Sequence, residues 1–148
     1  YFPNGKASDE RLDFKMRFYA AFEEYVENLR QQGRHIIICG DVNTAHTKND
    51  LARPKQNEQI SGFLPKEREW ITGFLKRGYI DTLREFTDAE GMYTWWVMRS
   101  PQARANNVGW RLDYFYINQE FRYALKDAYV LQHYKGSDHC PIGIDIAP

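Results

Sequence analysis

The segment GSDHCP, Gly136 to Pro141, places a carboxylate and an imidazole side by side near the end of the chain. Neighbouring side chains in an extended segment point in opposite directions, so Asp138 and His139 face different surroundings. Asp138 suits a hard cation, which prefers oxygen ligands, whereas His139 suits proton transfer or contact with an anion. The two residues are therefore candidates for serving one reaction from two sides. The alternative is a Gly-Ser-Asp turn that happens to precede a histidine.

A second candidate carboxylate lies inside the apolar and aromatic run RLDYFYI. Asp113 shares a strand face with Phe115 and Ile117, which is a costly position for a charge without a partner. A structural ion pair with any Arg or Lys would satisfy it. The functional interpretation is that Asp113 holds His139 in one tautomer and raises its basicity, which leaves the other ring nitrogen for a phosphate or a proton. We therefore expect Asp113 and His139 to lie within hydrogen-bond distance.

A third polar group follows a β-branched run in the segment GDVN. Asp41 and Asn43 are two residues apart just past a predicted strand, so both side chains can face the same way. The ends of strands are where α/β proteins bind ligands, although Gly, Asp and Asn are also common in simple turns.

Other reactive residues give weaker patterns. Ser137, His139 and an Asp raise the alternative of a Ser-His-Asp hydrolase. The chain has no Gly-x-Ser-x-Gly motif, and Ser137 precedes a further Asp rather than opening a helix, which disfavours that alternative. The remaining histidines, His35, His46 and His133, form no metal-binding spacing with one another.

Hydrophobic periodicity predicts elements that alternate between helix and strand. Helices are predicted over 9–32 and 65–78, a long loop over 44–64, a short helical patch around 119–126, and strands at His35–Cys39 and at YTWWV, RLDYFYI, AYVLQ and IGIDI. The β-branched run His35–Cys39 lacks polar alternation, which predicts a strand buried on both faces. This order of elements favours an α/β sandwich over a parallel doubly wound sheet.

Composition sets the remaining limits. The 148 residues suffice for one domain, and the 27% of charged residues indicate a soluble protein. The formal net charge of zero neither supports nor excludes a nucleic-acid partner. No apolar run could span a bilayer and no signal peptide is visible, so we expect no membrane association and no secretion. Cys39 and Cys140 are too few for a disulfide framework, which indicates a reducing compartment.

Taken together, the segments YFPNG, GDVN, YTWW, NVGWRLDYF and GSDHCP occur in the order and approximate spacing of a known family. The chain resembles the exodeoxyribonuclease III family of apurinic/apyrimidinic endonucleases, within the endonuclease/exonuclease/phosphatase superfamily. NVGWRLDYF together with GSDHCP is highly specific, whereas GDVN alone is not. The resemblance covers essentially the whole chain. It implies a single domain, 1–148, that forms the C-terminal part of a four-layer α/β sandwich with two packed β-sheets flanked by helices.

The resemblance also implies an activity and roles for individual residues. Family members are magnesium-dependent DNA-repair phosphodiesterases, with manganese as a further metal, that cut duplex DNA 5′ to abasic sites and can act as 3′-5′ exonucleases or 3′-phosphodiesterases. The implied catalytic residues are Tyr1 at the scissile phosphate, Asp41 and Asn43 at the attacking water or leaving group, and the orienting pair Asp113 and His139. The implied DNA contacts are Asn4 and an apolar pocket for the flipped-out sugar formed by Trp95, Trp110 and Leu112. The implied metal ligand is Asp138, with Asp41, Asn43 and His139 at a second metal in some family descriptions.

An apolar pocket would suit an abasic sugar, since a sugar without a base is extruded at lower cost than a paired nucleotide. Core packing is the alternative for Trp95, Trp96 and Trp110, and we expect Trp96 to be core. Other candidate functions are a different superfamily phosphoesterase, such as a general nuclease or an inositol-phosphate phosphatase, and a non-catalytic DNA-binding module.

The sequence departs from the family at its start, where YFPNGKASDE has neither Met nor a polar lead-in. Family members carry an N-terminal segment that supplies an asparagine near the phosphate and a glutamate that is a principal metal ligand. We therefore expect this chain alone to be impaired, with the N-terminal half supplied by the same longer polypeptide or by another chain. The expected location is the cytoplasm (nucleoid) or the nucleus.

Overall fold

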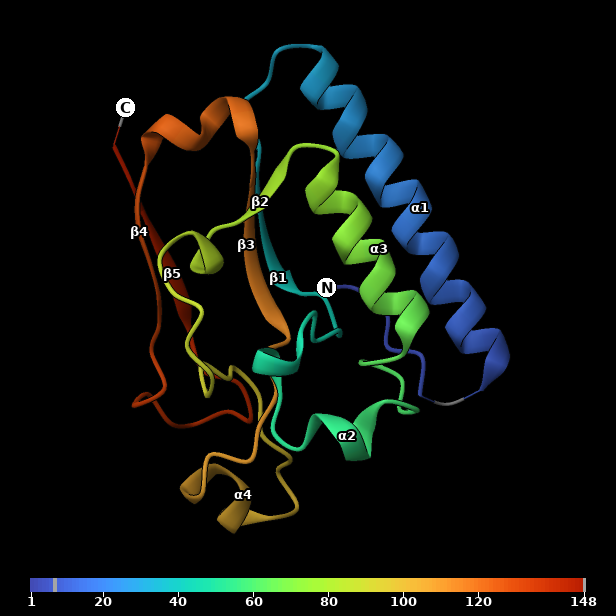
Figure 1. The fold of residues 1–148 in the computed structure, drawn as a ribbon, viewed down its shortest axis with the longest axis vertical. Helices are drawn as coiled ribbons and strands as arrows, with labels where there is room; N and C mark the ends of the chain where they lie inside the picture. The colour runs from blue at the N-terminus through green and yellow to red at the C-terminus, as the bar shows by residue number, and fades with distance from the viewer. Residues whose placement is uncertain (7, 148) are drawn as a thin grey trace.

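Two antiparallel β-sheets lie side by side, and two long helices cover the outer face of one of them (Figure 1). The computed structural model describes residues 1–6 and 8–147. Its elements, with η marking short 3-10 helices, are α1 (Asp9–Gln31), β1 (Ile37–Asp41), η1 (Lys48–Asp50), α2 (Pro54–Asn57), α3 (Pro65–Lys76), β2 (Tyr79–Asp81), η2 (Leu83–Glu85), α4 (Pro101–Ala105), β3 (Asp113–Asn118), η3 (Gln119–Ala124), β4 (Leu125–Val130) and β5 (Ile142–Ile146).

The first sheet has the strand order β1-β3-β2, and both pairings are antiparallel. Its register places Ile37 opposite Ile117 at one end and Asp41 opposite Asp113 at the other. The second sheet consists of β4 and β5, also antiparallel. The register of the first sheet therefore brings two carboxylates that the sequence separates by 72 positions to the same end of adjacent strands.

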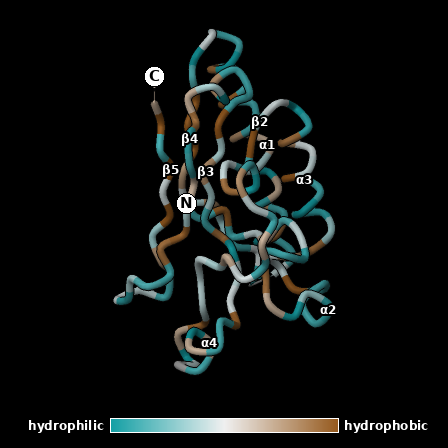
Figure 2. Tube along the Cα trace, turned by 60° about the vertical axis from the view of Figure 1, so that its left-hand side comes forward, coloured by the Kyte–Doolittle hydropathy of each residue, from teal (hydrophilic) through white to brown (hydrophobic). Residues whose placement is uncertain are grey.

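Both predicted long helices are present. α1 begins where the Ser8 hydroxyl accepts a hydrogen bond from the Arg11 amide (3.2 Å), and α3 begins at Pro65, a residue that suits the first turn of a helix. Hydrophobic and hydrophilic residues recur along both helices in Figure 2, as expected of helices with one face against a core. Their apolar faces pack on the first sheet in a cluster of buried residues: Phe2, Tyr19, Val26, Ile36, Val42, Ile71, Phe74, Tyr79, Tyr114 and Tyr116.

The opposite face of the first sheet packs against the second sheet. Ile80, Ile117 and Leu125 are buried there, with Ile144 and Ile146 of β5 against them. Along β3, Tyr114 and Tyr116 therefore face the helices while Ile117 faces the second sheet. Helices, first sheet and second sheet form successive layers, which confirms an α/β sandwich.

Several details differ from the sequence-based expectation. The prediction that β1 is buried on both faces is wrong: Ile37 is 46% exposed and Cys39 is also exposed. β1 is an edge strand of its sheet, and only its helix-facing side is covered by the described residues. The strand expected at YTWWV is absent. Only Trp95 in this segment forms β-bridges, one with Trp110 and one with His139. The short strand β2 was not predicted.

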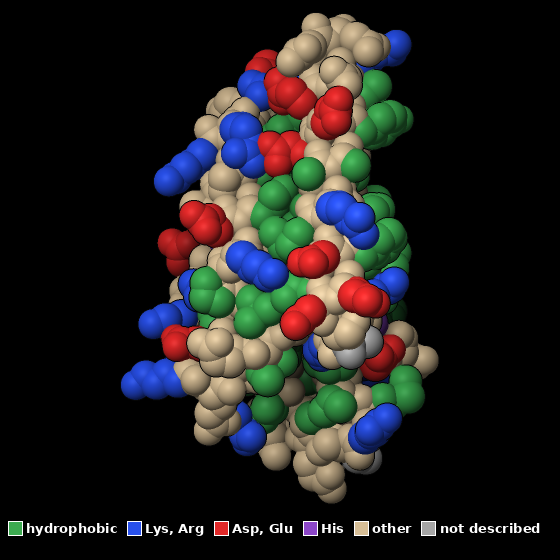
Figure 3. Space-filling model, turned by 90° about the vertical axis from the view of Figure 1, so that its right-hand side faces the viewer, with side chains coloured by type: hydrophobic (Ala, Val, Ile, Leu, Met, Phe, Trp, Pro, Cys, Tyr) green, Lys and Arg blue, Asp and Glu red, His purple; other side chains and the backbone are tan. Residues whose placement is uncertain are grey.

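The helix-covered side of the molecule shows acidic and basic side chains interspersed rather than segregated (Figure 3). Within residues 1–6 and 8–147, none of the helices combines the length and apolarity needed to cross a bilayer. Cys39 and Cys140 are free thiols.

Candidate active site

Asp41 and Asn43 form a closed pair at the end of β1. The Asn43 backbone amide donates to Asp41 Oδ1 (2.8 Å) and its side-chain amide donates to Oδ2 (3.0 Å), so both carboxylate oxygens are held by one residue. Asn43 has a φ of 54°, in the left-handed region that Asn enters more readily than most residues. The backbone of Phe2 joins the pair, donating to the Asp41 carbonyl (2.8 Å) and accepting from the Asn43 side chain (2.9 Å).

The environment of Asp41 changes its acidity. Burial, aided by the neighbouring carboxylate of Asp113, raises the pKa of Asp41 to about 6, against the opposing effect of the Asn43 amide. A carboxylate that titrates near pH 6 can exchange a proton with water close to neutral pH. Asp41 is therefore chemically suited to act as a general base, and Asn43 fixes the direction of its two oxygens.

Asp113 and His139 form the second pair, as predicted from the sequence. His139 Nδ1 lies 2.8 Å from Asp113 Oδ2, and because a carboxylate only accepts, Nδ1 donates. This hydrogen bond raises the pKa of His139, and the charge of Asp113 adds to the effect against partial burial. The other ring nitrogen, Nε2, is left for an external partner.

Thr94 holds Asp113 in place and was not identified from the sequence. Its hydroxyl donates to Asp113 Oδ2 (2.6 Å) and accepts from the backbone amides of Leu112 (3.0 Å) and Asp113 (3.1 Å). The side chain is fully buried. Thr94 lies in YTWW, 19 positions from Asp113, and no local pattern links the two.

Single bridges place the candidate site residues in a row. Leu51 pairs with Trp110, Trp110 with Trp95, and Trp95 with His139. The tryptophans proposed for the pocket therefore lie next to the Asp113–His139 pair. The Lys6 ammonium lies over both rings, 5.3 Å from the centroid of Trp95 and 5.8 Å from that of Trp110, at distances typical of cation–π contacts.

The three residues expected in the apolar pocket differ in burial. Trp110 and Trp95 are half-buried, whereas Leu112 is buried. Trp96 is 2% exposed and packs with Tyr93 and Cys140, which confirms its place in the core. An open hollow of about 530 Å³ lies beside Asp138, and its lining includes Trp96, Met98, Arg104 and Lys135.

The predicted metal ligand Asp138 is held by two neighbouring side chains. The Asp138 carboxylate accepts from Trp95 Nε1 (3.0 Å) at Oδ2 and from Ser137 Oγ (3.3 Å) at Oδ1. Among the described residues, no three His, Cys, Asp or Glu side chains are grouped so that they could hold a metal ion. Asp138, Asp41, Asn43 and His139 therefore stay predicted ligands.

Tyr1 and Asn4, which are expected to contact DNA, lie in the segment before α1. Tyr1 is 79% exposed, and its backbone precedes the Phe2 amide that bonds to Asp41. The carbonyl of Asn4 accepts from Arg11 Nε (3.2 Å), and its side chain is half-buried.

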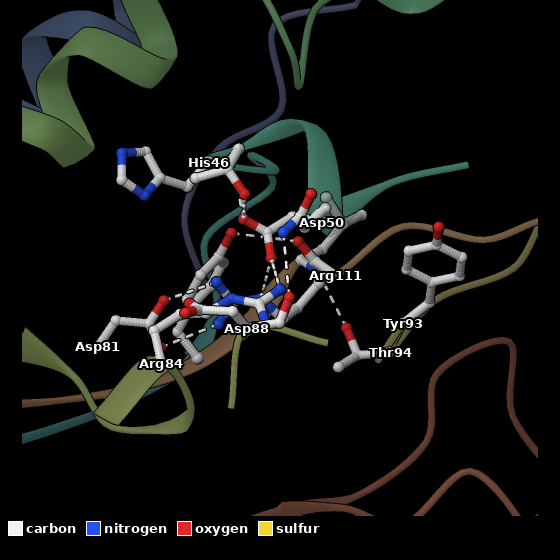
Figure 4. A network of polar contacts seen from close by, with 12 residues as sticks. His46, Asp50, Asp81, Arg84, Asp88, Tyr93, Thr94 and Arg111 are labelled. Carbon is white, nitrogen blue, oxygen red and sulfur yellow. Dashed lines mark hydrogen bonds and ion pairs between the residues drawn. The ribbon is translucent and has the colours of Figure 1, made fainter. Parts of the chain in front are cut away.

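A buried ionic network lies behind the Asp113 side of the site (Figure 4). The fully buried Arg111 donates to both oxygens of Asp81 (2.9 and 2.6 Å) and to Asp50 (2.7 Å), which also binds Arg84. Burial alone would lower the pKa of Arg111, but the charges of Asp81 and Asp50 raise it well above its usual value. The Arg111 amide also donates to the Asp50 carbonyl (2.7 Å). The network therefore fixes the backbone between Trp110 and Asp113, and no local pattern in the chain indicates it.

The sheets, the helices and the two polar pairs together define an α/β-sandwich protein with a candidate phosphate-handling site at one end of its first sheet. A family model for the endonuclease/exonuclease/phosphatase family matches residues 3–139. The chain belongs to this family. Nucleases of the family depend on a divalent metal.

Individual relatives agree with this assignment. The chain is 40% identical to an exodeoxyribonuclease of Bacillus subtilis over 147 residues, covering 99% of this chain and 58% of that protein. It is 40% identical to a DNA-(apurinic or apyrimidinic site) endonuclease of Dictyostelium discoideum over 148 residues, covering 97% of this chain and 40% of that protein. Over nearly its whole length, this chain is therefore similar to proteins named exodeoxyribonuclease and AP endonuclease.

A solved structure of the 3′ phosphatase NExo from Neisseria, bound to a product DNA hairpin, matches the fold with a TM-score of 0.91 and 25% identity, covering 99% of this chain and 59% of that chain. The chain thus spans about half the length of the relatives it matches.

Proposed function

We propose that this chain is the C-terminal portion of a DNA-repair phosphodiesterase that uses magnesium to cut duplex DNA on the 5′ side of abasic sites. The observation that carries the proposal is the 2.8 Å hydrogen bond between His139 and Asp113, at the sheet end where Asp113 lies opposite Asp41. The names of two relatives, an exodeoxyribonuclease and an apurinic or apyrimidinic site endonuclease, support DNA as the substrate.

In this proposal His139 stabilises the phosphate. A phosphodiester transition state concentrates negative charge on its non-bridging oxygens, and a donor aimed at that charge lowers the barrier. Asp113 occupies Nδ1 of His139, so Nε2 is the nitrogen that would donate to the phosphate. The raised pKa of His139 keeps this donor protonated over a wider pH range.

Asp41 takes the proton from the attacking water. Its pKa of about 6 leaves it ionised above that pH while keeping it a stronger base than an exposed carboxylate. Asn43 holds both oxygens, which limits the directions from which a water can approach. We expect the cleavage rate to rise with pH between about 5 and 7 as Asp41 loses its proton.

Trp95, Trp110 and Leu112 would form the wall that receives the bare sugar. Extruding a nucleotide costs least where no base has to be unstacked or unpaired, so a site built for the sugar alone selects the abasic position. The Lys6 ammonium over the two tryptophan rings supports this assignment, since it supplies positive charge where the flanking phosphates would lie.

The metal and part of the site would depend on an N-terminal portion. Magnesium needs several oxygen ligands, and Asp138 is a single carboxylate. When bound, the metal would supply Lewis-acid stabilisation of the phosphate. The exposed side of Ile37 and Cys39 on the edge strand β1 supports a further segment packing there.

The test compares the full natural polypeptide with this chain. The full polypeptide should cut abasic duplex in magnesium much faster than intact duplex, and Asp41→Asn should reduce the rate by about a thousandfold. The 148-residue chain alone should be nearly inactive, and adding the N-terminal segment as a separate chain should restore cleavage. Equal rates on abasic and intact duplex would favour a general nuclease. Strong metal-dependent cleavage by this chain alone, lost in its Asp41→Asn variant, would contradict the proposed division of the site.

A second activity, processing of DNA 3′ ends, is favoured by the exodeoxyribonuclease relative and by the 3′ phosphatase whose structure matches this fold. The same test with a duplex carrying a 3′-phosphate or a 3′ abasic remnant would measure it. If one site performs both reactions, Asp41→Asn should abolish them together.

A further inference from the structure

A lysine without access to solvent lies beneath the segment that carries Asp41 and Asn43. Lys15, on α1, is fully buried. Its ammonium donates to the Asn43 carbonyl (2.7 Å), to Thr44 Oγ1 (2.8 Å) and to Glu67 Oε1 (2.7 Å). An ammonium has three donors, and all three are used.

Glu67, the partner of Lys15, is equally buried at the first turn of α3. Its Oε2 accepts from the backbone amides of Gly62 (2.6 Å) and Leu64 (3.1 Å), and Ser61 Oγ donates to Oε1 (3.0 Å). A buried ion pair is often no more stabilising than a well-packed apolar pair of the same size. Stability alone therefore does not account for two fully buried charges at this position.

The contacts of Lys15 coincide with a strained backbone. Asn43 has a left-handed φ of 54°, a conformation that is costly for a residue other than glycine, and Lys15 binds the carbonyl of that same residue. The next residue is held as firmly: Thr44 Oγ1 contacts the Tyr19 hydroxyl (2.7 Å), and the Thr44 carbonyl accepts from Tyr114 (2.7 Å). Two helices thus hold the turn that begins at Asp41.

We propose that Lys15, together with Glu67, is a positioning residue for the reaction: it holds Asn43 in the left-handed conformation from which Asn43 fixes both oxygens of Asp41. The consequence for turnover rests on the proposed function, whereas the effect on the conformation of residues 43–45 does not. Lys15 acts through Asn43 and touches no reacting atom.

The experiment uses three variants of the full natural polypeptide. Lys15→Met removes the ammonium but leaves Glu67 charged and buried. The double variant Lys15→Met/Glu67→Gln removes both charges, which should restore most of the stability lost in the single variant. The control Glu23→Gln/Arg77→Met breaks a different ion pair, between α1 and the residue that follows α3, and this pair does not contact residues 43–45.

Two measurements separate positioning from simple stabilisation. In the double variant, hydrogen exchange of the Asn43 and Ala45 amides should become about tenfold faster, as for the loss of one charged hydrogen bond, while the β1 amides stay unchanged. The kcat on abasic duplex should fall about a hundredfold, the effect of a displacement of about 1 Å, with little change in KM. The control should change neither quantity.

A double variant that recovers stability, exchange protection and kcat together would overturn the proposal, because the pair would then serve stability alone. A rise in KM at unchanged kcat would also overturn it. If the unaltered polypeptide does not cut abasic DNA, the proposed function fails, and the hydrogen exchange of Asn43 and Ala45 still decides whether Lys15 positions the turn.

Discussion

The two sides of the candidate site are held by different means. Asp41 ends a regular strand, and the turn after it is held by one buried ion pair, Lys15 with Glu67, between two helices and by two tyrosine hydroxyls at Thr44. Asp113 follows an irregular segment that pairs with its neighbours one residue at a time, and the network around Arg111 lies behind it. The Asp113 side thus uses four buried or half-buried charged residues, and the Asp41 side uses two.

This difference shows what irregular backbone requires. Apolar packing is not directional, so by itself it does not fix the angle of a loop. Hydrogen-bonded charges are directional and become stronger in a dry interior. The segments around Asp50, Thr94 and Trp110 lie outside the regular strands and are joined by backbone hydrogen bonds between single residues. The Arg111 network and the Thr94 hydroxyl add directional side-chain contacts to these bonds.

The comparison predicts that Arg111→Met is the most damaging single substitution. It leaves Asp81 buried without its partner, and we expect a loss of about 4–5 kcal/mol in the free energy of unfolding.

Lys15→Met should cost about 3 kcal/mol in the free energy of unfolding, because Glu67 keeps its backbone and Ser61 donors. Urea unfolding monitored by tryptophan fluorescence measures both values. The exposed pair of Arg122 with Glu85 is the control, and Arg122→Met should cost less than about 1 kcal/mol. Equal losses for Arg111 and Lys15 would remove the distinction between the two sides.

Trp110→Ala tests whether the wall on the Asp113 side acts on the extruded sugar. In the full polypeptide, single-turnover cleavage of abasic duplex should fall about a hundredfold, since the wall acts once the nucleotide has left the helix. Duplex binding should change by less than about threefold, because binding rests mainly on phosphate contacts. Cleavage assays and fluorescence anisotropy measure the two quantities, and parallel losses in both would argue against a pocket.

Thr94→Val removes the hydroxyl that holds Asp113 and keeps the shape of the side chain. Two backbone amides lose their acceptor, so we expect a loss of about 1–3 kcal/mol in the free energy of unfolding. The Asp113–His139 distance should also become less defined, which would show as broadened His139 resonances in NMR spectra. Unchanged stability and unchanged spectra would mean that Thr94 does not contribute to holding the pair.

For Asp113→Asn, the smallest of the expected effects, we predict a change in the pKa of His139. Asp113 raises the pKa of His139, so the substitution should bring that pKa back toward its ordinary value of about 6.5. A raised histidine pKa contributes stability that is fully present below about pH 6.5 and is lost as the pH rises through the folded-state value. The stability difference between wild type and Asp113→Asn should therefore be largest at acid pH and shrink above it. NMR titration of His139 and unfolding at pH 5.5 and 8.5 measure this, and an unchanged pKa would contradict the proposed role of Asp113.

The local elements of the fold could be predicted from the sequence because their signals are local. The step of three or four between Leu12, Met16 and Tyr19 predicted α1, and Pro65 with Gly78 bounded α3 closely. The alternation around Asp113 placed it on the opposite strand face from Tyr114, as the two cores require. The short strand β2 and the single bridges at Trp95 escaped prediction, since three residues or fewer carry no readable period.

The burial of β1 was wrongly predicted for a different reason. The run IIIC is apolar whether or not a neighbour covers it, and only the position of β1 at the sheet edge leaves Ile37 exposed. Apolar composition indicates what a strand can bury, and the partners present decide what it does bury.

By itself, the sequence determined which residues could do chemistry here: a carboxylate on an apolar strand face, a histidine in a terminal turn, and an Asp-x-Asn at a strand end. It also predicted the pairing of Asp113 with His139, although an ion pair of Asp113 with any Arg or Lys was the alternative, and the 2.8 Å contact decides between the two. Only the tertiary structure decided how these groups are held. Lys15, Thr94 and Arg111 act over separations of 19 to 61 positions. Contacts at such separations depend on how helices and sheets pack, and no local pattern in the chain records them.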